Sequence, residues 1–238
     1  YYYNNQLRSG QSPDYSAPRV MECFYNFIEA FGTRYDGDPR IAAVEMGLLG
    51  HWGEWHFSDG VEEPTVAQYR QVVGKYEAFY KKTHVLIRKV WMLDAGRVYE
   101  IGMHDDVYGT AEYGDGASGN ESLQTRISQR HWLRHPLGGE VLPSLQKPKS
   151  SIFKEGGYTG GLAYKGWKPL ADESHTSFLL VRNAQYFSGV ELQNAIESAA
   201  YLGYDFAVNR VYYRDVLARS ADFKLGVSIQ NRGVAPFY

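Results

Sequence analysis

Apolar positions along the chain follow two alternating spacings. They recur every three or four residues between 16 and 35 and between 65 and 82, which predicts two amphipathic helices. Ser16 is a suitable N-cap for the first of these helices. Its apolar face would comprise Val20, Phe24, Phe27, Ile28 and Phe31. Short apolar runs predict strands at 41–46, 84–93, 99–106, 135–143 and 175–183, with further helices at 122–134 and 189–206.

The order of these elements indicates the fold class. Strands that alternate with helices at this spacing predict parallel βα units, and therefore either an α/β sheet or a (β/α)8 barrel. Residues 223–238 change to an alternation of period two with Gly and Pro, which predicts the opening strand of an appended β-sandwich. Residues 1–11 show no clear continuity with the first predicted helix, and the chain stops as the β-rich segment begins. We therefore expect part of a longer protein, or a chain whose internal segments have been joined.

The composition is biased toward aromatic residues, with 20 Tyr, 11 Phe and 5 Trp. Such side chains suit carbohydrates, because the C–H faces of a sugar stack on aromatic rings while polar ring substituents bond its hydroxyl groups. A formal net charge of −2 provides no basic surface, so a nucleic-acid partner is not expected. No apolar run approaches the ~18 residues of a membrane span. The single cysteine, Cys23, is predicted to be buried on the apolar side of the first helix.

Charged and aromatic side chains gather where predicted strands end. The βα loops of a parallel sheet meet at its carboxyl edge, so residues at that edge can form one site. Glu54 follows the strand at 41–46, and Glu140 lies in the strand at 135–143, three strands later. Trp52 and Trp55 flank Glu54 in an otherwise polar loop, which favours a binding surface over core packing.

Four segments together resemble a family of largely uncharacterised bacterial proteins. The segments are residues 13–56, "IGMHDDVYG", "HPLGGE" and "SIQNRGVAPFY", and the likeness covers about residues 14–238. Its most specific part is "GxWGEWH". Proteins of this family have a glycosidase-like barrel followed by a β-sandwich. The resemblance implies a (β/α)8 TIM-type barrel over residues 1–222, incomplete at its N-terminus, and the first strand of a β-sandwich over 223–238.

The resemblance also implies roles for the two glutamates. The clan of retaining glycoside hydrolases places its acid/base and its nucleophile three strands apart, which implies Glu54 as acid/base and Glu140 as nucleophile. Trp52 and Trp55 would surround Glu54 with apolar groups that keep it protonated. The clan usually has Asn before the acid, whereas this chain has Gly53. The usual bond from that Asn to the sugar 2-hydroxyl must therefore be replaced or absent.

We therefore expect a secreted or cell-surface glycoside hydrolase that cleaves a poly- or oligosaccharide by a two-carboxylate mechanism, without a cofactor. Exposed ring faces are expected for Trp52, Trp55 and Tyr108. The substrate-binding side chains expected are His51, Trp52, Trp55, His56, Arg88, His104, Asp105, Asp106, Tyr108 and His175.

Two other functions stay open. A non-catalytic carbohydrate-binding or structural barrel would need the aromatic residues but not both carboxylates, and Glu54 could then pair with Arg88 beneath the sheet. A metal-dependent hydrolase could use the histidines and aspartates, although "HWGEWH" lacks the helical HExxH spacing. The "HDD" at 104–106 could instead hold a structural calcium ion. The sugar, its linkage and the oligomeric state stay open.

Overall fold

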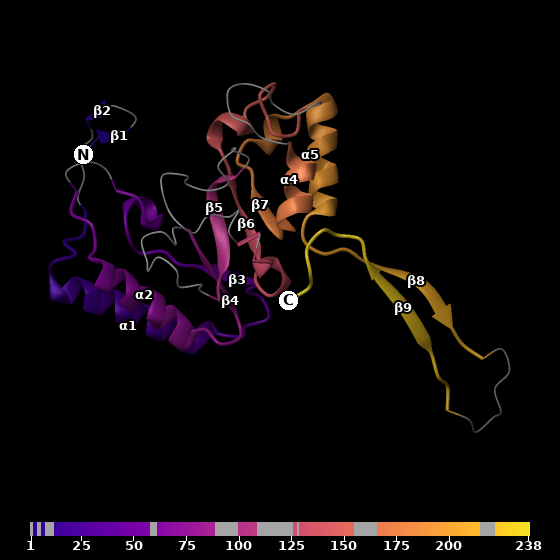
Figure 1. Cartoon of the computed structure of the whole chain (residues 1–238), viewed down its shortest axis with the longest axis horizontal. Helices are drawn as coiled ribbons and strands as arrows, with labels where there is room; N and C mark the ends of the chain where they lie inside the picture. The colour runs from indigo at the N-terminus through magenta and orange to yellow at the C-terminus, as the bar shows by residue number, and fades with distance from the viewer. Residues whose placement is uncertain are drawn as a thin grey trace.

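A curved five-stranded parallel sheet forms the centre of the protein (Figure 1). The computed structural model describes residues 12–57, 61–88, 100–108, 126–127, 129–154, 166–214 and 222–238, and two paired N-terminal strands, β1 (Tyr2–Tyr3) and β2 (Gln6–Leu7). The strands of the large sheet lie side by side in chain order: β3 (Ala43–Glu45), β4 (His84–Ile87), β5 (Gly102–Tyr108), β6 (Leu137–Val141) and β7 (Phe178–Leu180). The predicted α/β class is confirmed as a half-barrel, and the described residues do not form the eight strands of a complete (β/α)8 barrel.

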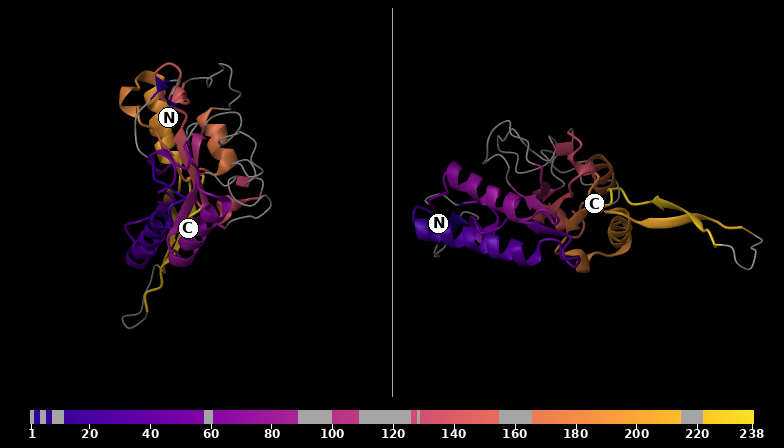
Figure 2. Two further views of the ribbon diagram at one scale, coloured as in Figure 1. Left: turned by 90° about the vertical axis from the view of Figure 1, so that its left-hand side faces the viewer. Right: turned by 90° about the horizontal axis from the view of Figure 1, so that it is seen from below.

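Helices cover one face of this sheet (Figures 1 and 2). In a parallel sheet, alternate residues of each strand point to opposite faces. Apolar residues such as Val44 and Ile87 pack in one core cluster with α1 (Pro18–Tyr35) and α2 (Val66–Phe79). Residues of β5 and β6 pack in a second cluster with α4 (Trp167–Ser174) and α5 (Gly189–Tyr201). The opposite face, which we call the inner face, carries charged residues as well as apolar ones such as Leu86 and Phe178.

Short 3₁₀ helices make up several of the connections. They are η1 (His51–Gly53), η3 (His131–Leu133), η4 (Pro143–Gln146) and η5 (Ala184–Tyr186). Of the helix predicted at 122–134, residues 126–127 are helical and residues 131–133 form η3, while residues 122–125 and 128 lie outside the described residues. Within the described parts of the chain, no helix combines the length and apolar character needed to cross a membrane.

The first helix differs from its sequence-based prediction in two ways. Its N-cap is Ala17, because the Ser16 hydroxyl donates to Asp14 Oδ1 (2.6 Å) instead of capping the helix. The prediction that Cys23 is buried is wrong, since Cys23 is exposed. Phe27 is also 50% exposed, and the buried residues of this helix are Met21, Ile28 and Gly32. The buried stripe is therefore rotated toward Met21, the side on which α2 and the sheet lie.

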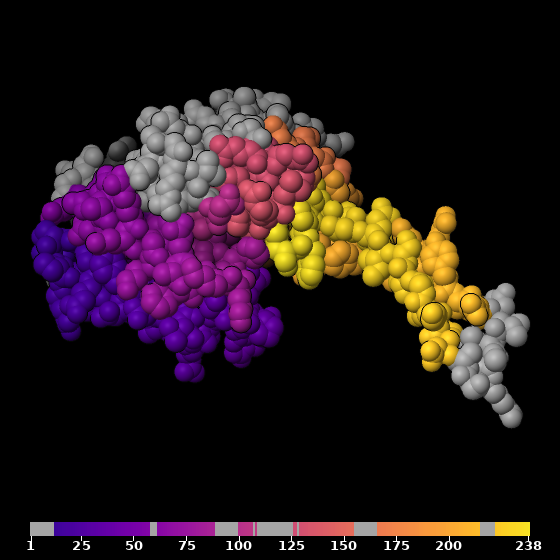
Figure 3. Space-filling view, turned by 60° about the horizontal axis from the view of Figure 1, so that its bottom comes forward, coloured from indigo at the N-terminus to yellow at the C-terminus, as the bar shows by residue number. Residues whose placement is uncertain are grey.

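A β-hairpin arm projects from the body of the protein (Figures 1 and 3). It consists of β8 (Phe206–Tyr212) and β9 (Gly226–Asn231), which pair antiparallel. Val208 and Ile229 are register partners on this arm, and each is 61% exposed. The strand predicted within residues 223–238 is thus present as β9, and its partner is β8, on the other side of the predicted domain boundary. The β-sandwich itself stays a prediction.

Candidate functional site

A charged cluster lies on the inner face at the carboxyl edge of β3, β4 and β5. Arg88, just after β4, places Nη2 3.0 Å from Glu45 Oε2 and 3.9 Å from Glu54 Oε1. Its Nη1 contacts Asp106 Oδ1. His104 Nδ1 contacts Glu45 Oε1, and His104 is almost completely buried. Three carboxylates therefore surround one guanidinium, and the structure brings together residues from three neighbouring strands, as the sequence predicts for this edge.

Contacts in the cluster favour the ionised form of Glu45. Burial raises the pKa of Glu45, but the hydrogen bond and charge of His104 and the charge of Arg88 outweigh burial, so this pKa lies below its ordinary value. The Arg88 side chain is only 9% exposed. A buried guanidinium of this kind needs carboxylate partners, because an unpaired charge in the interior is costly.

The loop that carries Glu54 runs through left-handed backbone. Leu48, Gly50, Trp52, Gly53 and Trp55 all have φ between 54° and 76°. This region is uncommon for residues other than glycine and costs on the order of 1 kcal/mol for each. The loop is closed by hydrogen bonds such as that from the Trp55 N–H to the Leu49 carbonyl (2.9 Å). This conformation decides which side chains of the loop turn outward and which turn inward.

The exposed side of this loop presents an aromatic group beside Glu54. Trp52 is 66% exposed, and its ring centroid lies 5.4 Å from that of His56. The His51 and His56 rings are 5.7 Å apart, and His56 Nε2 lies 3.9 Å from Glu54 Oε2. His51, Trp52 and His56 therefore form one cluster of rings, which His56 places next to the Glu54 carboxylate. The apolar surroundings predicted for Glu54 are not found, because Arg88 and His56 lie next to its carboxylate.

Glu140 reaches the same edge from β6. It aligns with Leu180 of β7, while Gly138 aligns with both His104 and Phe178, so Glu140 and His104 point to the same face. Its carboxylate is 11% exposed and lies 3.2 Å from Arg182 Nε. Gln146 Nε2 donates to Glu140 Oε1 (3.3 Å). Glu140 is therefore held at both sides by polar groups that follow β6 and β7.

Two of the predicted ring faces do not line a cleft. Trp55 is completely buried, donates its indole N–H to the Gly47 carbonyl (3.2 Å) and packs against Tyr69. Tyr108 is also completely buried, and its hydroxyl bonds Thr176 Oγ1 (2.7 Å). The prediction of exposed rings is wrong for both, because the left-handed loop turns Trp55 into the helix-facing core and a bulge in β5 turns Tyr108 the same way.

Two further predicted binding residues lie away from the cluster. Asp105 is buried and alternates with His104 and Asp106 along β5, so it points toward the helices. His175 ends α4 with φ 47° and stacks on Trp132, with ring centroids 3.5 Å apart. Since His175 precedes β7, it lies at the amino edge of a parallel sheet, opposite to Glu54. Both predictions of substrate contact at the carboxyl edge are therefore corrected.

Two charged residues of this edge were not predicted. Glu45 is the one charged residue in the run "IAAVEM", and Arg182 follows the apolar run "SFLLV". A charge at the end of an apolar strand is the signal that could have identified both. Among the described residues, no group of three or more His, Cys, Asp or Glu side chains is arranged to hold a metal ion.

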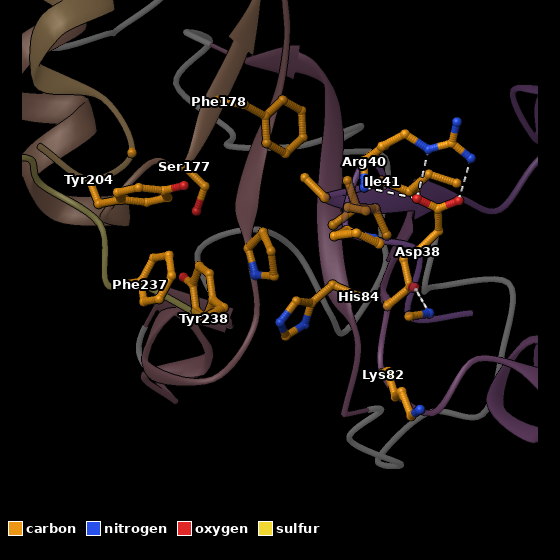
Figure 4. A pocket seen from close by; sticks show the side chains of 18 of the residues that line it. Asp38, Arg40, Ile41, Lys82, His84, Ser177, Phe178, Tyr204, Phe237 and Tyr238 are labelled. Carbon is orange, nitrogen blue, oxygen red and sulfur yellow. Dashed lines mark hydrogen bonds and ion pairs between the residues drawn. The ribbon is translucent and has the colours of Figure 1, made fainter. Parts of the chain in front are cut away.

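A hollow of about 910 Å³ opens at the opposite, amino edge of the sheet (Figure 4). It shares Glu45 with the charged cluster but includes neither Glu54 nor Glu140. One side is aromatic and the other carries charged residues of the α1–β3 connection (Figure 4). This hollow is therefore separate from the two predicted catalytic residues.

No family profile, curated protein or solved structure matches the chain.

Proposed function

We propose that the protein is a glycoside hydrolase that acts through Glu54 and Glu140. The observation that carries this proposal is that both glutamates lie at the carboxyl edge and on the inner face of one parallel sheet. Glu54 follows β3, and Glu140 lies in β6, three strands further along the sheet. In barrels and half-barrels of parallel strands, this edge is where loops from several strands converge on one ligand. The exposed Trp52 beside Glu54 offers a ring face on which a sugar can stack.

In the proposed reaction, Glu54 protonates the glycosidic oxygen and Glu140 attacks the anomeric carbon. Water then hydrolyses the glycosyl ester, with Glu54 acting as the base, so the anomeric configuration is retained. Arg182 and Gln146 hold the Glu140 carboxylate in place for attack. His56 Nε2, 3.9 Å from Glu54 Oε2, adds a polar neighbour to this carboxyl group.

The experiment compares Glu54→Gln and Glu140→Gln on a panel of aryl glycosides and polysaccharides. Glu140→Gln should lower kcat by at least about a thousandfold on every substrate, because no glycosyl ester can form. Glu54→Gln should spare substrates whose leaving group needs no proton, and azide should restore its turnover. Glu100→Gln is the matched control, because Glu100 is an exposed glutamate at the amino edge. Equal losses in both variants without azide rescue would contradict these roles.

The second candidate function is carbohydrate binding without catalysis. It is favoured by the ion pairs that occupy both glutamates, with Arg88 beside Glu54 and Arg182 beside Glu140. In that case the protein would bind sugars through Trp52. No turnover would be measured in the unaltered protein or in either glutamine variant. Product analysis by NMR separates the two functions, since only the hydrolase releases a reducing sugar.

A further inference from the structure

The hollow at the amino edge has one aromatic wall. Phe178, Tyr204, Phe237 and Tyr238 form this wall, and His84 lies between it and the opposite side (Figure 4). Tyr204 and Phe237 are 54% and 63% exposed, so their rings are open to a ligand. Their centroids lie 4.8 Å apart with the rings nearly perpendicular, which fixes the position of both. The wall therefore presents preformed ring faces to the hollow.

The opposite wall carries positively and negatively charged side chains that can form hydrogen bonds. Arg40 forms two hydrogen bonds to the Asp38 carboxylate, with Nη2 2.6 Å from Oδ2 and Nε 3.0 Å from Oδ1. Lys82 and Glu45 contribute one further charge of each sign to the lining. The charged residues of the lining therefore balance. Such a surface offers no net attraction to an anion or a cation, and it can bond hydroxyl groups, which both donate and accept.

We infer that this hollow is a second ligand site, which takes a neutral oligosaccharide. Ring faces suit the C–H surface of a sugar, the planar Arg40–Asp38 pair suits its hydroxyl groups, and the absence of net charge in the lining suits an uncharged ligand. The volume of about 910 Å³ lies within the range of small-ligand sites and accommodates a few sugar rings. This inference does not rest on hydrolysis by Glu54 and Glu140, which lie at the other edge of the sheet.

Together with the proposed function, on which this further role rests, the site predicts a role in holding long substrates. The two edges share the inner face of one sheet, and Glu45 belongs both to the hollow and to the charged cluster. A chain bound in the hollow would be kept near the carboxyl edge, which raises its effective concentration there. Short substrates that reach only Glu54 would not benefit. Substitutions in the hollow should therefore raise KM for long chains and leave the turnover of small aryl glycosides unaffected.

The experiment measures binding by calorimetry in the Glu54→Gln/Glu140→Gln double variant, so that turnover does not interfere. The probes are cellohexaose, xylohexaose, mannohexaose and maltohexaose, with an oligogalacturonate as the anionic probe. At least one neutral probe should bind, and Tyr204→Ala or Phe237→Ala should weaken it about tenfold, or ~1.4 kcal/mol. Tyr186→Ala is the matched control, because Tyr186 is 65% exposed and lies outside the hollow.

Three results would overturn the inference. These are no binding of any neutral probe, tighter binding of the oligogalacturonate, and binding that neither Tyr204→Ala nor Phe237→Ala weakens. The last result would assign the sugar to the carboxyl edge. Failure of the proposed hydrolysis gives a different result. The unaltered protein would then show no turnover, but a neutral probe would still bind in the hollow and Tyr204→Ala would still weaken that binding.

Discussion

Arg88 Nη2 lies 3.0 Å from Glu45 Oε2 and so joins the carboxyl ends of β4 and β3 on the inner face. The same guanidinium contacts Asp106 and approaches Glu54. Arg88→Met should therefore remove the guanidinium that three carboxylates face and leave these carboxylates close together. We expect a loss of about 3 kcal/mol in the free energy of unfolding, measured with urea at neutral pH.

The control for this change is Arg134→Met. Arg134 pairs with Glu100, but both side chains are more than half exposed. An exposed pair contributes at most about 1 kcal/mol because water and salt screen it. Similar losses in the free energy of unfolding of the two variants would show that the Arg88 cluster stabilises the protein no more than an exposed ion pair does.

Gly139 of β6 lies directly opposite Asp105 of β5. A Cβ at this position would meet the Asp105 carbonyl oxygen at 2.0 Å and the Asp105 nitrogen at 2.7 Å. Gly139→Ala should therefore push the strands apart and lower the free energy of unfolding by about 3 kcal/mol or more. Gly74→Ala on α2 is the matched control, because nothing lies within 4 Å of the added Cβ. It should stabilise the protein by about 0.5–1 kcal/mol, and a stabilising Gly139→Ala would contradict the packing of these strands.

Trp52 and Trp55 lie three residues apart and should respond in opposite ways to alanine substitution. Trp52 is 66% exposed, so Trp52→Ala should leave the melting temperature unchanged while raising KM about tenfold on saccharides. Trp55 is completely buried, and Trp55→Ala should cost about 3–5 kcal/mol of stability. Thermal unfolding and substrate titration of both variants test this division. A Trp52→Ala variant that binds saccharides normally would remove Trp52 from the site.

Asp36 links the end of α1 to the connection before β4. Its carboxylate accepts backbone N–H bonds from Lys81, Lys82 and Thr83 at 2.9, 2.9 and 2.8 Å. Burial raises the pKa of Asp36, but these bonds outweigh burial and hold the pKa below its ordinary value of 3.8. Because the folded pKa is depressed, the stabilisation is present above about pH 4 and is lost as pH falls through the folded value.

Asp36→Asn should therefore lower stability by about 1 kcal/mol at pH 7, after allowance for solvent screening. The difference from the unaltered protein should shrink as the pH falls below about 4. Urea unfolding at several pH values measures it. Asn209→Ala is the control, since Asn209 bonds the uncharged Gln230 and its effect should not vary with pH. A pH-independent effect of Asp36→Asn would show that the charge of Asp36 is not what stabilises this connection.

The sequence by itself determined the order of the strands and helices and the strands that deliver Glu54 and Glu140. The spacing of apolar residues indicates whether a helix or a strand can bury them on one face. The direction of each strand follows from the direction of the chain. The strands at 43–45, 84–87, 102–108, 137–141 and 178–180 all fall within or beside predicted runs. A carboxylate at the end of a parallel strand is thus assigned to one edge before any contact is known.

Only the tertiary structure decided which side chains of these segments are open to a ligand. Trp52 and Trp55 share one loop, but positive-φ backbone turns one outward and the other into the core. The hollow is lined by residues from Gly37 to Tyr238, which no local pattern could associate. The physical reason is that burial depends on contacts between residues far apart in sequence, whereas periodicity reports only on neighbours.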